Sequence, residues 1–71
     1  MKPVYITIEI NGEPFNCSSN MSLQDVVHYL GLNSTTILLE YNKQIVSDQH
    51  LSNIFLKSDD QLEILTIVGG G

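Results

Sequence analysis

The chain has 71 residues, which is enough for one domain with a single small core. Its apolar fraction of 42% is typical of an ordered globule, and no stretch approaches the roughly 18 to 20 apolar residues that a membrane span needs. Eight acidic residues against three lysines give a formal net charge of −5, which argues against nucleic acid as a ligand. An acidic surface suits a protein partner with a basic patch, and a gain in solubility alone explains it equally well.

The first predicted elements are two strands joined by a tight turn. Residues 4–10 alternate with period two, and the inward positions would be Val4, Ile6, Ile8 and Ile10. Asn11-Gly12 is the strongest short signal for a type I′ hairpin. A second strand over residues 13–18 would place Phe15 and Cys17 on one face, and Pro14 indicates an edge position.

A short helix is predicted next. Ser22 is typical of an N-cap, and Asp25 three residues later makes an acidic variant of the capping box. Gly31 suits the position just after the helix. One apolar stripe follows the helical spacing and should lie on the sheet; its residues are Leu23, Val26, Val27 and Leu30.

A third strand over residues 37–41 should turn Glu40 and Leu38 outward. Its inward residues would be Ile37, Leu39 and Tyr41. Asn42-Lys43 predicts a turn, followed by a short extended piece at residues 45–46.

The last part of the chain should hold one helical turn within residues 47–57 and a final strand over residues 62–68. Asp59-Asp60 between them is interpreted as a solvated turn. Leu62 and Ile64 would point inward in the final strand.

The order β-β-α-β-β-β predicts an α+β fold, a ubiquitin-like β-grasp with a mixed four- to five-stranded sheet and one helix packed on one face. The first and last strands would lie side by side and parallel, because the intervening helix supplies the crossover that parallel strands need.

Several apolar residues fall on the face assigned to solvent. They are Leu38, Leu65 and Ile67, with Val68 next to them. An exposed apolar group of this kind usually marks a protein interface, and we expect a partner to bind there. The alternative is a register error of one residue, which would bury some of them.

The chain ends on Gly69-Gly70-Gly71. We expect residues 1–68 to form the domain and residues 69–71 a flexible tail, thin enough to thread a narrow channel and present Gly71 to a reaction. A frayed terminus or a truncated chain is the alternative.

These features together resemble the ubiquitin-like sulfur carriers, and within them the ThiS family. The resemblance covers nearly the whole chain. It rests on the helix entry at residues 21–27, the Asn-x-x-Ile-Val segment within residues 40–46, and the ending at residues 60–71 with its terminal glycine pair.

The resemblance implies a carrier that acts as a substrate, with no cofactor and no enzyme activity of its own, monomeric when free. An E1-like adenylating enzyme of the ThiF type would adenylate the Gly71 carboxylate after Gly69 and Gly70 thread into it. Sulfur from a cysteine desulfurase would then give a C-terminal thiocarboxylate, which a thiazole synthase of the ThiG type would use to form the thiazole of thiamin.

Three other functions stay open. The small subunit of molybdopterin synthase has the same fold and tail but donates its sulfur to a dithiolene. A ubiquitin-like modifier would form isopeptide bonds to lysines of its targets. A plain interaction module would bind its partner equally well without the tail.

No catalytic or metal-binding group is evident in the sequence. Cys17, the only cysteine, is expected to be a buried structural thiol, and His28 and His50 are isolated from further ligands. A single cysteine excludes an internal disulfide, and the N-terminus lacks the apolar core of a signal peptide. These features predict a reducing compartment, the cytoplasm or, for an organelle-encoded chain, the plastid stroma.

Overall fold

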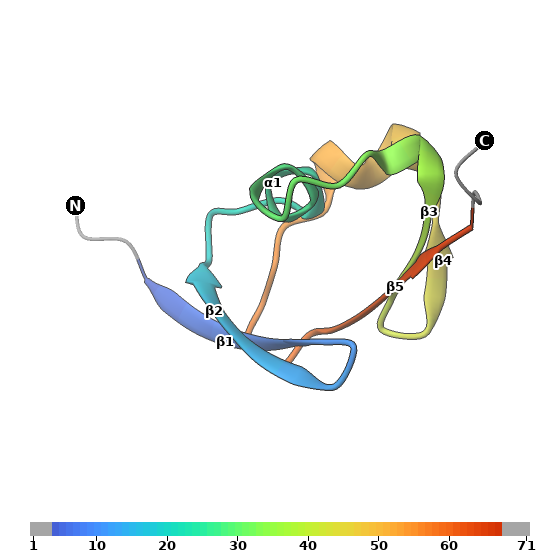
Figure 1. Cartoon of the computed structure of the whole chain (residues 1–71). Helices are drawn as coiled ribbons and strands as arrows, with labels where there is room; N and C mark the ends of the chain where they lie inside the picture. Colours follow the sequence, from blue (N-terminus) through green and yellow to red (C-terminus); the bar gives the residue numbers. More distant parts are fainter. Residues whose placement is uncertain (1–3, 68–71) are drawn as a thin grey trace.

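A computed structural model describes residues 4–67 of the chain. It has a five-stranded sheet with one α-helix and two short 3-10 helices. The elements in chain order are β1 (Tyr5–Ile10), β2 (Glu13–Ser18), α1 (Leu23–Tyr29), η1 (Ser34–Thr36), β3 (Ile37–Tyr41), β4 (Gln44–Val46), η2 (Asp48–Asn53) and β5 (Gln61–Thr66). Figure 1 shows α1 and η2 on the same side of the curved sheet.

The strand order is β2-β1-β5-β3-β4, so β5 occupies the centre of the sheet. β1 and β5 run parallel with Ile10 opposite Leu62, whereas the other three pairs are antiparallel. This arrangement confirms the predicted β-grasp fold, and Pro14 lies on the edge strand β2, where its missing N–H disturbs no ladder.

Two hairpin turns use residues with positive φ. Asn11 and Gly12 have φ values of 52° and 82°, and Asn42 and Lys43 have values of 50° and 72°. Paired positive φ angles match the right-handed twist of the strands on either side, as expected for type I′ turns.

The helix begins with the predicted capping box. The Asp25 N–H donates to Ser22 Oγ at 3.2 Å, and the Ser22 N–H donates to Asp25 Oδ2 at 2.9 Å. The chain leaves the helix at Gly31, whose φ of 72° suits a glycine. Leu30 is 38% exposed, which corrects its placement on the buried stripe; α1 ends at Tyr29 and Leu30 is the C-cap.

The core lies between the sheet and α1, and η2 and the loop after it contribute Leu51 and Leu56. Its buried residues are Ile8, Cys17, Leu23, Val26, Val27, Ile37, Leu39, Leu51, Leu56 and Leu62. Val4 was expected to point inward but is exposed, because it precedes β1 at the end of the sheet. The prediction that the final strand runs from residue 62 to 68 is also corrected, since β5 starts at Gln61 and ends at Thr66.

Candidate functional site

The described chain leads out of the sheet through β5. The Ile67 N–H donates to the Thr36 carbonyl at 3.0 Å, so pairing with the β3 side continues to the last described residue. The predicted reactive residue Gly71, the predicted threading residues Gly69 and Gly70, and Val68 lie outside the described residues. The described structure therefore shows the base from which the tail starts.

The remaining predicted interface residues gather on the outer face of the sheet, away from α1. Leu38 on β3 lies directly opposite Leu65 on β5. Ile67 follows Leu65 by two residues and faces the same side by the alternation of an extended chain. Leu65 and Ile67 are 55% and 58% exposed, and Leu38 is half-buried, so the three form an apolar surface.

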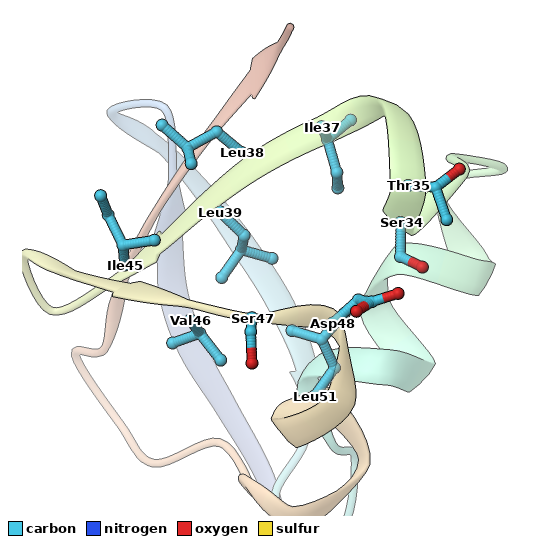
Figure 2. Close-up of a pocket in the computed structure, with 10 residues that line it drawn as sticks. All are labelled: Ser34, Thr35, Ile37, Leu38, Leu39, Ile45, Val46, Ser47, Asp48 and Leu51. Carbon is cyan, nitrogen blue, oxygen red and sulfur yellow. The ribbon is translucent and has the colours of Figure 1, made fainter. Parts of the chain in front are cut away.

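Ile45 on β4 belongs to the same surface and was not predicted. It lies opposite Glu40 of β3 and is 66% exposed. Figure 2 shows Leu38 and Ile45 extending to one side of β3 and β4, and Leu39 and Val46 to the other. We call Leu38, Ile45, Leu65 and Ile67 the outer apolar patch.

The outer apolar patch borders a cavity at the edge of the sheet. This cavity of about 370 Å³ lies between β3, β4 and the two 3-10 helices, and Leu38, Ile45 and Leu51 are among its lining residues. The hollow gives a partner's side chain a place to enter beside the exposed leucine and isoleucine side chains.

Two acidic residues adjoin the outer apolar patch. Glu40 and Glu63 lie directly opposite each other on β3 and β5, and alternation places both on the outer face. Like charges in direct cross-strand contact oppose folding. A cationic group of a partner placed between them would relieve that repulsion.

Asp60 is a buried anchor at the start of β5, which corrects its prediction as part of a solvated turn. It is 5% exposed, whereas Asp59 beside it is exposed. Asp60 Oδ2 accepts hydrogen bonds from Tyr41 Oη at 2.6 Å and from the Lys57 N–H at 2.7 Å, and Oδ1 accepts one from Asn42 Nδ2 at 3.2 Å.

This environment shifts two pKa values. Burial by itself raises the pKa of the Asp60 carboxyl, but the hydrogen bonds from Tyr41, Lys57 and Asn42 and the Lys57 charge outweigh it, so the net pKa falls below its ordinary value. Burial, followed by the hydrogen bond to Asp60 and its negative charge, raises the pKa of Tyr41 to about 12. At neutral pH the pair is therefore a phenol donating to a carboxylate, which is a structural arrangement.

Cys17 does not offer a reactive thiol. It is 5% exposed, and its pKa is raised by burial and by the negative charge of Asp60. Reactive cysteines need exposure and a lowered pKa, and the prediction that this thiol is buried is confirmed. Among residues 4–67 no three histidine, cysteine or acidic side chains come together as metal ligands.

None of the helices formed by residues 4–67 has the length and apolar character to cross a membrane.

The β-grasp sheet, the outer apolar patch and the short helix define a ubiquitin-like domain. The solved structure of the thiamine biosynthesis protein ThiS from Geobacter metallireducens has this fold, with a TM-score of 0.79, 19% identity, and coverage of 93% of this chain and 100% of that chain. A model of the ThiS family matches residues 8–71. The chain therefore belongs to the ThiS family.

Relatives of two kinds match the chain. The uncharacterized protein Ycf40 of Porphyra purpurea is 46% identical over 66 residues, which are 93% of each chain. The thiazole synthase of Magnetococcus marinus is 34% identical over 64 residues, 90% of this chain but only 20% of that protein. That protein, named thiazole synthase, therefore contains a segment that resembles this chain.

Proposed function

We propose that the chain is the sulfur carrier for thiazole formation in thiamin biosynthesis, and that it is a substrate of other enzymes with no catalytic activity of its own. The observation that carries the proposal is the ThiS-family match, which runs through the glycine tail to residue 71. The buried thiol and the structural role of the Tyr41–Asp60 pair agree with a carrier.

The reactive group in this proposal is the α-carboxylate of Gly71. An α-carboxyl has a reference pKa of about 3.3 to 3.7, so it is ionised and a poor electrophile at neutral pH. An E1-like enzyme of the ThiF type activates it: the carboxylate attacks the α-phosphate of ATP, pyrophosphate leaves, and the acyl-adenylate forms. The terminal sulfur of a persulfide, supplied by a cysteine desulfurase, then displaces AMP, and a thiol cleaves the resulting acyl disulfide to leave the thiocarboxylate.

The proposed acceptor of the sulfur is a thiazole synthase of the ThiG type. The relatives from Magnetococcus marinus and Paramagnetospirillum magneticum support this pathway, since proteins named thiazole synthase contain a segment like this chain. They favour the thiazole branch over transfer to a molybdopterin dithiolene.

In this proposal the outer apolar patch holds the carrier against its partners while the tail reaches their active sites. Leu65 and Ile67 lie on the strand that leads into the tail, so a partner bound there stands close to the tail's origin. Glu40 and Glu63 add a preference for a basic group on the partner. We also propose a reducing compartment, cytoplasm or plastid stroma, in keeping with the single free thiol.

The test of this function uses variants at the reactive end. Gly71→Ala and a chain extended by one residue should fail to form the thiocarboxylate, because a side chain or an extra residue displaces the carboxylate in a narrow channel. The chain is incubated with the activating enzyme, ATP and a persulfide source, and intact-mass spectrometry reports exchange of one oxygen for sulfur.

Thermal unfolding is the control, and both variants should melt like the unaltered chain because the buried core residues of the described chain fall between Ile8 and Leu62. Full conversion of either variant would refute the proposed role of Gly71.

A further inference from the structure

β5 has no strand partner on the β1 side over its last four residues, 63–66. β1 ends at Ile10, which pairs with Leu62, while β5 runs on to Thr66. The N–H and C=O groups of β5 beyond that point would face no strand on the β1 side. An unpaired strand edge is more mobile than a paired one.

The Asn11 side chain fills this place. The Ile64 N–H donates to Asn11 Oδ1 at 2.7 Å, and Asn11 Nδ2 donates to the Ile64 carbonyl at 3.1 Å. The Asn11 N–H also donates to the Leu62 carbonyl at 2.8 Å. The side-chain amide thus supplies the donor and acceptor that a continuing strand would have offered.

Asn42 does the same at the start of β5 from the β3 side. The Gln61 N–H donates to Asn42 Oδ1 at 2.8 Å, the Asn42 N–H donates to the Gln61 carbonyl at 2.8 Å, and Asn42 Nδ2 donates to Asp60 Oδ1. The β1–β2 turn and the β3–β4 turn, which lie on either side of β5 in the sheet, therefore both hold this strand through asparagine amides.

The turns themselves do not require these amides. Asn11 and Asn42 have φ values of 52° and 50°, which glycine adopts without strain. The amides instead contact residues 53, 19 and 18 positions away along the chain, which lie on β5 or just before it. Their effect is to fix the strand that carries the tail.

We infer that Asn11 and Asn42 are positioning residues for the tail: by clamping β5 they fix the direction in which the chain leaves the sheet, and so present the Gly71 carboxylate to the activating enzyme. The inference rests on the proposed function. Four residues follow Ile67 and span at most about 14 Å, so the direction of the chain at Ile67, just after β5, restricts where the carboxylate can lie. Loss of orientation slows a reaction even when binding is unchanged.

The test compares Asn11→Gly, Asn42→Gly and the double variant with the unaltered chain. Glycine keeps the positive φ of each turn and removes only the amide contacts. Lys43→Gly is the matched control, because Lys43 lies in the same turn as Asn42 with a φ of 72° and an exposed side chain. Hydrogen exchange should quicken at the Ile64 amide in Asn11→Gly and at the Gln61 amide in Asn42→Gly, and at neither in Lys43→Gly.

The functional measurement is the steady-state rate of adenylation of each variant, below the temperature at which any of them unfolds. We expect kcat to fall about tenfold or more in the double variant while KM stays within about twofold, because docking through the outer apolar patch is retained and orientation is lost. Asn11→Asp keeps the acceptor for the Ile64 N–H. Its kcat should therefore lie between that of Asn11→Gly and that of the unaltered chain.

If the unaltered chain is adenylated and the double variant has the same kcat as Lys43→Gly, the positioning role is overturned and the proposed function stands. If the unaltered chain is not adenylated, the proposed function fails, and the positioning role falls with it.

Discussion

Asp60 joins three parts of the chain through its carboxylate and its main-chain carbonyl. It accepts hydrogen bonds from Tyr41, Asn42 and the Lys57 N–H, and its own carbonyl accepts from the Glu9 N–H at 2.9 Å. The sequence Asp59-Asp60 is typical of an exposed turn, and nothing local separates the two residues. The burial of Asp60 could not be predicted because its side-chain partners Tyr41 and Asn42 lie 19 and 18 positions away.

Replacing this carboxylate should destabilise the domain in a pH-dependent way. Asp60→Asn replaces one acceptor oxygen by an NH2 group, which would face another hydrogen-bond donor. We expect the free energy of unfolding at pH 7, measured by urea titration, to fall by about 1 to 3 kcal/mol. Because the folded-state pKa of Asp60 lies below its ordinary value of 3.8, its contribution is present above that value and is lost as the pH falls through the folded-state pKa.

The control for this change is Asp59→Asn, the same substitution at an exposed neighbour with a φ of 70°, which asparagine tolerates. An equal stability loss in the two variants, or a loss at Asp60 that did not shrink in acid, would contradict the anchoring role of Asp60.

At the scale of elements, signals within one strand, turn or helix were sufficient wherever a local rule governs the structure. The Asn11-Gly12 turn, the Ser22 capping box and the strand over residues 37–41 are as predicted. Features that depend on pairing between elements could not be predicted from the sequence in the same way. The sequence predicts only that Ile45 lies in a short extended piece. Its position opposite Glu40, which the structure gives, is what places it on the outer face with Leu38.

The outer apolar patch should contribute to binding with little contribution to folding. Leu65→Ser removes an exposed side chain, so the free energy of unfolding should change by no more than about 1 kcal/mol. Affinity for the activating enzyme, measured by calorimetric titration, should fall about tenfold or more if the patch is the docking surface.

Tyr5→Ser is the matched control, since Tyr5 is 74% exposed on β1, a different strand from those that carry the patch. Unchanged affinity in Leu65→Ser, or an equal loss in Tyr5→Ser, would show that the partner binds elsewhere.

At the scale of the whole molecule, the strand order places the last strand, β5, at the centre of the sheet. β5 lies between β1 and β3, so the strand that leads toward the C-terminus has a neighbouring strand on each side. The order of elements along the sequence was enough to predict this topology, because a parallel first and last strand with one crossover helix has few alternatives. The chemistry proposed for the terminus rests on the family resemblance, since residues 69–71 carry no side chain that would specify it.

The central claim is that the chain carries sulfur at its C-terminal carboxyl group. The most direct measurement is tandem mass spectrometry of the C-terminal peptide from protein isolated from its own host under conditions that preserve thioacids. The account predicts a fraction of molecules in which one oxygen of Gly71 is replaced by sulfur, with the fraction falling when the cysteine desulfurase is removed. A terminal peptide that carries only oxygen while the host is making thiamin would contradict it.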